Sequence, residues 1–362
     1  MDADRSGRRL FEIDAVKFFA IFFMICAHVY EQFGSFDHHG TMPDSIYRNL
    51  VEFIGGPLAA PVFMFCMGIG MVYTRHDTPS DFIRRGLKLL ITGYLLNFFR
   101  QTVPMLIGMA LGVETGLSLI GGLLNVDILP FAGMAFITIG LLKRLGLKPY
   151  QMFFFAVILQ GAGIWATKID IPSVALATLV GLILPGGAHV AFSLMLWLVY
   201  PVLGILFGTR LKETKDRGDL YKKILLPAVL FFAAYSLTLL FFGYDIRLIY
   251  VLYKDSYYNQ TLLHTLWILP IILIAVSTSF FVYRRLENSI LGRFMTYCST
   301  NLTSIYITQW LLIGYGLGFF ILLGFEATSS PVALTLGALV LMAVSTCITA
   351  ARNAIRRRKK RA

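Results

Sequence analysis

Long, predominantly apolar runs recur along the whole chain, and short segments between them hold most of the charge. An α-helix needs about 20 apolar residues to cross the hydrocarbon core of a bilayer. We therefore predict an all-α, polytopic membrane helix bundle with about ten transmembrane helices. The expected ranges are 12–33, 53–74, 86–108, 126–142, 150–167, 189–208, 224–243, 262–283, 299–323 and 331–351.

Composition favours a membrane protein over a soluble one. Hydrophobic residues make up 57% of the chain and charged residues 14%, with a mean hydropathy of +0.71. Soluble domains average about 45–50% apolar and about 25% charged residues. The net charge of +12 is spread over short loops, which argues against a nucleic-acid-binding face. The cysteines lie in apolar runs without paired spacing and predict no metal site: Cys26, Cys66, Cys298 and Cys347.

An eleventh apolar stretch, 171–184, is short and bounded by prolines. If it does not cross and the N-terminus is inside, 26 of the 32 lysines and arginines fall on the inner side. If it does cross, the strongly basic loop 210–223 moves outside, against the positive-inside rule. We therefore predict that 171–184 is a re-entrant or surface segment that caps an internal chamber.

The same charge distribution predicts that both termini are cytoplasmic and that the protein resides in a cytoplasmic (inner) membrane. Residues 1–351 are expected to form a single transmembrane domain. Residues 352–362 form a basic tail suited to contact with anionic lipid. The basic residues left on the outer side are Arg48, Arg100, Lys168, Arg247 and Lys254.

The first helix carries two ionisable residues, Lys17 and His28, within an apolar run. Ionisable groups in transmembrane segments are costly and indicate function. Their separation of eleven residues places them on one side of the helix, with an axial rise of about 16 Å. Together they can mark the two ends of a polar path. Alternatively, Lys17 can reach the inner interface, and His28 can simply bond a neighbouring helix.

A second candidate site is the basic cluster Arg84, Arg85 and Lys88 at the cytoplasmic start of the third helix. It can bind phosphates, for which guanidinium and ammonium donors are suited, or it can serve only the membrane topology. Asp127 precedes the fourth helix at about the level of His28. It can orient the imidazole as part of a catalytic pair, or it can cap the helix.

Further polar residues lie within the predicted transmembrane helices, and an aromatic stretch lies just outside them. The aromatic outer stretch 244–258 matches an interfacial belt, although tyrosines also stack on sugars. The remaining embedded polar residues are Asn97, Gln160, His264 and Gln309.

The start of the chain resembles the transmembrane acyltransferases of the acyltransferase-3 superfamily. The resemblance is carried by Arg9, Ile13, Asp14 and Lys17, followed after ten residues by His28. This spacing is similar to the family signature of an arginine or lysine, ten residues and a histidine in the first helix. Lys17 stands where arginine is more common.

Three later motifs resemble the same superfamily, and two of them lean toward its heparan-α-glucosaminide N-acetyltransferase-like branch. They are the Phe-rich, Gly-ended run 62–68, the basic element 85–88 and the Asp127-Ile128-Leu129 motif with Gly133. These matches cover roughly the first 145 residues.

The resemblance implies transfer of an acyl group, usually acetyl from acetyl-CoA, to a glycan or amino-sugar acceptor across the membrane, without a metal. On this basis Arg84, Arg85 and Lys88 would bind the phosphates of CoA, and Lys17 would lie along the pantetheine arm. His28 would act on the acceptor hydroxyl or amine, with Asp127 as its partner. A secondary transporter of a small polar metabolite or a non-catalytic membrane scaffold are the competing interpretations.

Overall fold

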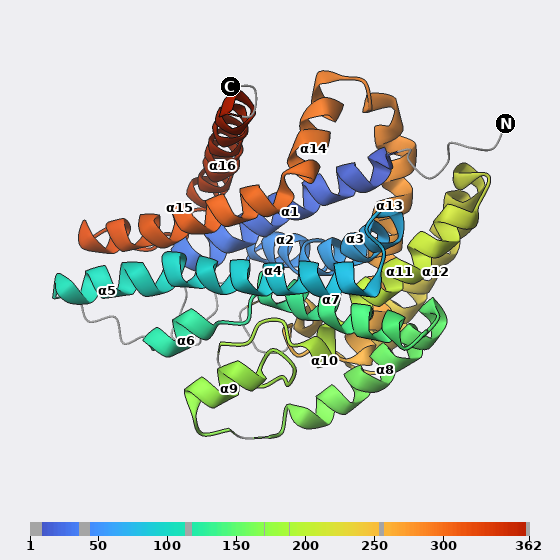
Figure 1. The fold of residues 1–362 in the computed structure, drawn as a ribbon, viewed down its shortest axis with the longest axis horizontal. Helices are drawn as coiled ribbons and strands as arrows, with labels where there is room; N and C mark the ends of the chain where they lie inside the picture. The colour runs from blue at the N-terminus through green and yellow to red at the C-terminus, as the bar shows by residue number, and fades with distance from the viewer. Residues whose placement is uncertain are drawn as a thin grey trace.

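The computed structural model describes residues 9–35, 44–112, 118–169, 171–187, 189–252 and 257–359. Within these ranges every regular element is a helix, and the only β-structure is two isolated bridges, Gly34–Thr328 and Val126–Val190. Figure 1 shows the helices packed side by side in one bundle. The predicted all-α helix bundle is confirmed.

Most helices follow the predicted spans, although several are divided. The elements are α1 (Phe11–Phe33), α2 (Ile46–Gly55), α3 (Ala60–Tyr73), α4 (Pro79–Asn97), η1 (Phe98–Thr102), α5 (Val103–Ala110), α6 (Leu119–Leu124), α7 (Ile128–Arg144), α8 (Pro149–Ala166), α9 (Val174–Val180), α10 (Leu194–Trp197), α11 (Val199–Glu213), α12 (Arg217–Phe241), η2 (Ile246–Ile249), α13 (Leu262–Tyr283), η3 (Arg284–Leu286), α14 (Ile290–Thr300), α15 (Leu302–Leu322) and α16 (Pro331–Lys359).

Seven helical segments among the described residues are long and apolar enough to cross a bilayer, so the protein is a multi-pass membrane protein. They are α1, α2–α3, α10–α11, α12, α13–η3, α15 and α16. The other three predicted spans are also helical, as α4–η1–α5, α7 and α8. Of these, α7 has only 17 residues, and α4 is charged in its first half. That these three helices also cross the membrane, for a total of ten crossings, therefore stays a prediction.

The stretch 171–184 forms a short helix that cannot cross a membrane. Seven residues of α9 span about 10 Å at 1.5 Å per residue. In Figure 1, α9 lies with α6 on one face of the bundle, and the two helices are in contact. The amide of Val126 also bonds the carbonyl of His189 at 2.9 Å, which ties the following loop to the start of α7. The length of α9 agrees with the prediction that this stretch does not cross.

Helix α1 lies at the centre of the bundle and packs against α2, α3, α13, α14, α15 and α16. Two buried acidic residues anchor its first turn. Glu12 accepts from Arg217 at 3.0 Å, and Asp14 accepts from Ser299 at 2.6 Å and pairs with Arg9. Burying a carboxylate is costly unless it is paired, so these contacts fix the start of α1 against α12 and α14.

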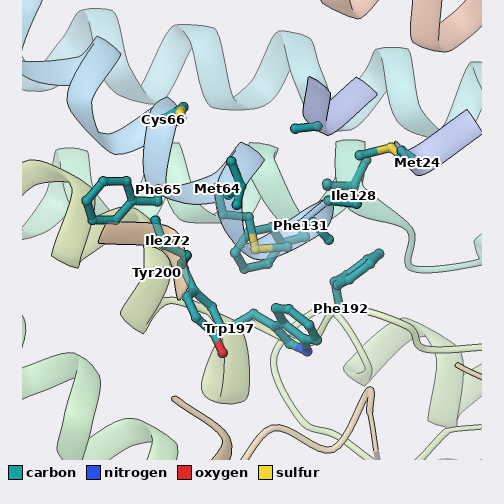
Figure 2. Packing of buried hydrophobic residues seen from close by; sticks show 14 of the residues in the cluster. Met24, Met64, Phe65, Cys66, Ile128, Phe131, Phe192, Trp197, Tyr200 and Ile272 are labelled. Carbon is teal, nitrogen blue, oxygen red and sulfur yellow. The ribbon is translucent and has the colours of Figure 1, made fainter. Parts of the chain in front are cut away.

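Large buried side chains of α3, α7 and the α10–α11 region form one apolar cluster beside α1. Figure 2 shows Met64 and Phe65 of α3 near Phe131 of α7, with Trp197 and Tyr200 below them. All five side chains are at most 1% exposed. Trp197 also donates from its indole nitrogen to the Tyr258 carbonyl at 3.0 Å. This cluster holds the elements that flank the middle of α1.

Glycines set the distance between two helix pairs. A Cβ on Gly68 would lie 2.0 Å from the carbonyl oxygen of Pro201, and one on Gly204 would lie 2.0 Å from that of Phe65. Helices α3 and α11 are therefore in backbone contact. Gly86 and Gly133, in motifs that resemble the acyltransferases, allow the same backbone contact between α4 and α7. Small residues promote such close packing in membranes.

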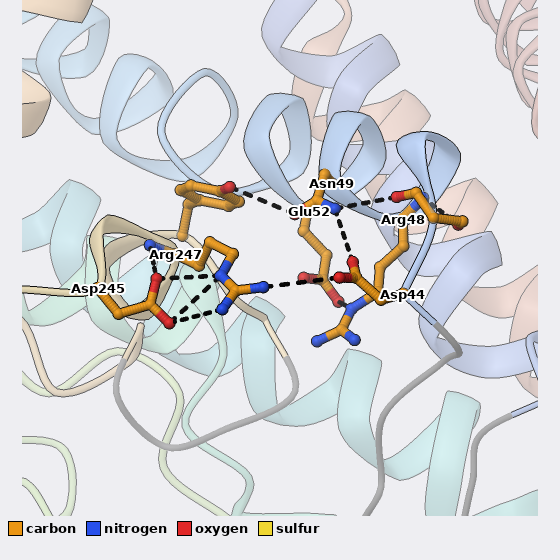
Figure 3. A network of polar contacts seen from close by, with 8 residues as sticks. Asp44, Arg48, Asn49, Glu52, Asp245 and Arg247 are labelled. Carbon is orange, nitrogen blue, oxygen red and sulfur yellow. Dashed lines mark hydrogen bonds and ion pairs between the residues drawn. The ribbon is translucent and has the colours of Figure 1, made fainter.

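A network of ion pairs covers the predicted outer end of α2 (Figure 3). Arg247 bonds Asp245 at 3.0 Å and lies 3.6 Å from Asp44, while Arg48 bonds Glu52 at 3.3 Å. The hydrogen bonds from Arg247 lower the pKa of the exposed Asp245 carboxyl. Two of the basic residues predicted to be outside, Arg48 and Arg247, are thus paired with acids at this rim.

The close contact between α3 and α11 yields a stability prediction. Gly68→Ala introduces a Cβ where no space exists and should lower the free energy of unfolding by about 1–3 kcal/mol. Gly70→Ala is the matched control, because a Cβ there meets nothing within 4 Å. Thermal unfolding in detergent, followed by size-exclusion chromatography, measures both. Equal midpoints for the two variants would contradict the close contact.

Candidate functional site

His28 lies in the second half of α1 and keeps part of its surface accessible. Its Nδ1 atom is 2.9 Å from Nε2 and 3.3 Å from Oε1 of Gln309. The imidazole packs on the Trp310 ring at 4.1 Å and lies 6.3 Å from the Tyr306 ring. Tyr306, Gln309 and Trp310 share one face of α15, because helical positions three and four apart are neighbours.

The contact with Gln309 engages Nδ1 of His28 and leaves Nε2 on the other side of the ring. No hydrogen bond to Nε2 is found within the described ranges. The closer amide atom is the Gln309 nitrogen, and when it donates to Nδ1 the ring proton lies on Nε2. When the amide is turned so that its oxygen accepts from Nδ1, Nε2 carries a lone pair that can accept a proton. A side-chain amide can therefore orient this imidazole without a carboxylate.

Asp127 lies close to this histidine but contacts it only through a neighbour. Its Oδ1 accepts from the Ile128 amide at 2.7 Å, so Asp127 caps α7. Its Oδ2 accepts from the Tyr306 hydroxyl at 2.7 Å and pairs with Arg100 at 2.9 Å. The structure thus shows the helix cap and places Tyr306 between Asp127 and His28. A catalytic part for Asp127 stays a prediction.

Tyr306, Trp310 and Arg100 are parts of this site that the sequence analysis missed, and Arg100 was counted as an outer basic residue. Arg100 lies within the continuous helix α4–η1–α5, in the π-helical turn η1, and is 3% exposed. Its guanidinium packs over the Trp310 ring at 4.0 Å. Gly314 makes this possible, because a Cβ there would lie 2.1 Å from the Arg100 carbonyl oxygen.

One signal in the sequence and one in the structure point to Arg100. The first is a charge within an apolar run, which is rare unless it is functional. The second is structural, because π-helical turns occur frequently at functional sites. Only Nη2 of Arg100 is paired with Asp127, while Nε and Nη1 have no hydrogen-bond partner in the described part of the chain.

A cavity of about 450 Å³ opens beside this cluster, between α5 and α15. Arg100 and Trp310 line it, together with Gln32, which lies one turn after His28. His189, from the loop that follows α9, also lines it. His28 and Gln309 do not line the cavity themselves, but Trp310, on which the imidazole packs, forms part of its wall.

A carboxylate stands one turn beyond the histidine. Glu31 accepts from the Tyr258 hydroxyl at 3.2 Å. Tyr258 belongs to the aromatic stretch 244–258, so at least this tyrosine reaches into the bundle. Tyr253 of that stretch lies outside the described residues.

The basic candidates lie away from His28, at the predicted cytoplasmic end. Lys17 is partly buried in the first half of α1 and has no ion pair within the described ranges. Arg84, Arg85 and Lys88 are exposed at the start of α4, where Arg85 packs over Phe136 at 4.6 Å. Their binding roles stay predictions.

The other embedded polar residues have structural partners. Asn97 donates to the Asn125 carbonyl at 2.7 Å, and Gln160 donates to Thr265 at 2.9 Å. The His264 ring lies 3.3 Å from the Tyr244 hydroxyl. Gln309 differs from these three because its partner is an imidazole beside a cavity.

The acyltransferase-3 family, described as an acyltransferase domain, matches residues 10–350. The match spans nearly the whole chain and includes α1, α7 and α15. No curated protein matches the chain.

The Arg100–Asp127 pair predicts a strong energetic coupling. Asp127→Asn retains a helix-capping side chain but leaves a buried guanidinium without its counter-charge, which should cost about 3–5 kcal/mol. Adding Arg100→Met should recover much of this loss, because the unpaired charge is removed. Chemical unfolding of the two single variants and the double variant forms the test. Additive losses would contradict a direct pair.

Proposed function

We propose, from the premise that this membrane protein belongs to the acyltransferase-3 family, that it transfers an acetyl group from cytoplasmic acetyl-CoA to a carbohydrate-type acceptor on the other side. The hydroxyl or amine of a glycan or amino sugar would receive the group. The observation that carries the proposal is the His28–Gln309 contact beside the cavity, which leaves the imidazole Nε2 available.

The donor is proposed to bind at the cytoplasmic end. The phosphates of CoA are anionic, and Arg84, Arg85 and Lys88 present exposed cationic donors at the start of α4. Lys17 lies deeper, on the same helix as His28 and about 16 Å before it along the axis. The pantetheine arm would extend from the basic cluster past Lys17.

The acceptor is proposed to react at His28. The hydroxyl oxygen or amine nitrogen of the acceptor attacks the thioester carbonyl carbon of acetyl-CoA. At the same time Nε2 of His28 takes up the proton from that hydroxyl or amine. The carbon–sulfur bond then breaks, and the CoA thiolate receives the proton from the imidazolium. General-base catalysis of this kind contributes typically about 10²–10⁴-fold in rate. Gln309 holds the ring through Nδ1 during both proton transfers.

The distribution of charges supports the proposed orientation in the membrane. With both termini in the cytoplasm of an inner membrane, the basic residues gather at the end of the bundle that carries Arg84. His28, Glu31 and the cavity then lie toward the outer side. This arrangement supports an acceptor outside the cytoplasm and acyl transfer across the bilayer.

His28→Ala should abolish transfer, with a loss of at least about 10²-fold. The control is His76→Ala, since His76 is exposed in the loop between α3 and α4. Mass spectrometry of envelope glycans and small sugars, from cells with and without each variant, measures the acyl-dependent mass difference. Full acylation by His28→Ala, or metabolite uptake into proteoliposomes without consumption of acetyl-CoA, would contradict the proposal.

The donor site predicts a change in KM. Arg84→Gln combined with Lys88→Gln should raise KM for acetyl-CoA about tenfold and leave kcat nearly unchanged, because binding but not chemistry is weakened. Arg293→Gln removes an exposed basic residue from α14 and should leave KM unchanged. Steady-state kinetics in detergent compare these variants. A fall in kcat at constant KM would contradict a role of the basic cluster in binding acetyl-CoA.

A further inference from the structure

The cavity beside Arg100 is also a groove that opens toward the lipid. Its walls are α5 and α15, which contact each other and run side by side at one end of the bundle (Figure 1). Several lining side chains also present large apolar surfaces outward. Ile107 is 46% exposed, Phe319 64% and Ile321 53%. A groove with such walls joins the membrane interior to the polar site.

The inner end of the groove is polar and incompletely paired. Arg100 lines it with Nε and Nη1 unpartnered, and the neighbouring Gln101 contributes a buried Oε1 that also has no partner in the described part of the chain. Leaving buried donors and acceptors unsatisfied is costly. These atoms therefore indicate a ligand rich in oxygen atoms at this end.

We propose that the groove binds a membrane-embedded, amphipathic acceptor: an apolar chain between α5 and α15, joined to an oxygen-rich head group beside Arg100 and His28. This inference rests on the proposed function, and it specifies the acceptor as a lipid-linked molecule. The head group carries the hydroxyl or amine that forms the new ester or amide bond as the thioester breaks.

The contrast between the two ends of the groove favours this occupant. A free sugar would need the polar end but not a lateral apolar opening lined by exposed side chains. The acyl chain of the donor would arrive from the end that carries Arg84 and Lys88, whereas the groove lies at the end that carries Gln32. An amphipathic acceptor uses both parts of the groove.

A glycine keeps the groove open. Gly318 lines it, and a Cβ at this position would meet nothing within 4 Å. Gly316 has equally free space on the same helix but does not line the groove. A large side chain at position 318 would thus fill the groove without a backbone clash, and one at position 316 would not enter it.

The first test follows the product of the unaltered protein. Membranes from the native cells are incubated with radiolabelled acetyl-CoA and extracted with chloroform and methanol. Label that depends on His28 should enter the organic phase. His28-dependent label confined to the aqueous phase would overturn the lipid-linked acceptor and leave the acyltransferase proposal intact. A lack of His28-dependent label in both phases would overturn both.

The second test compares two variants in membranes of a deletion strain. Gly318→Trp should lower the transfer rate about tenfold, while Gly316→Trp should stay within about twofold of the unaltered protein. Gly318→Leu replaces Gly318→Trp if size-exclusion chromatography shows that the larger side chain prevents folding. Equal rates for both positions, with His28→Ala inactive, would mean that the groove holds an ordinary bilayer lipid only and would overturn the inference.

Discussion

The ion pair between Arg100 and Asp127 is the interaction on which the site depends. A guanidinium buried at 3% exposure within the bundle requires a counter-charge, and Asp127 supplies it at 2.9 Å. The same carboxylate caps α7 and accepts from Tyr306 of α15. One pair thus joins α4–η1–α5, α7 and α15, and it orders the face of α15 on which Gln309 holds His28.

Close glycine contacts make this electrostatic arrangement possible. Helices α4 and α7 approach through Gly86 and Gly133, and α15 approaches η1 through Gly314. Without these contacts the guanidinium and the carboxylate would stand on helices too far apart to pair. The two acyltransferase-like motifs that contain Gly86 and Gly133 therefore have a packing function, whatever the basic residues beside them bind.

The sequence predicted the helices well because the period and length of apolar runs are local properties. It placed His28 and Asp127 correctly at helix α1 and at the start of α7, and it separated the short stretch 171–184 from the long apolar spans. It did not connect them, because Gln309 and Trp310 lie about 280 residues further along the chain than His28. It also counted Arg100 as an outer basic residue, since the π-helical turn that buries this residue depends on packing against Gly314.

The proposed transfer requires side chains in the middle of α1 to move. In the proposed transfer the path runs from Lys17 to His28. The side chains between them are at most 5% exposed: Ile21, Met24 and Ile25. Figure 2 shows Met24 near the cluster that contains Met64 and Phe131. An acyl-pantetheine arm can reach His28 only if side chains here move aside. Methionines are suited to this because their unbranched side chains adapt to different packing. Under the proposed function, the tightly packed centre would separate donor from acceptor until the donor arm enters. The incompletely paired Arg100 would face the acceptor.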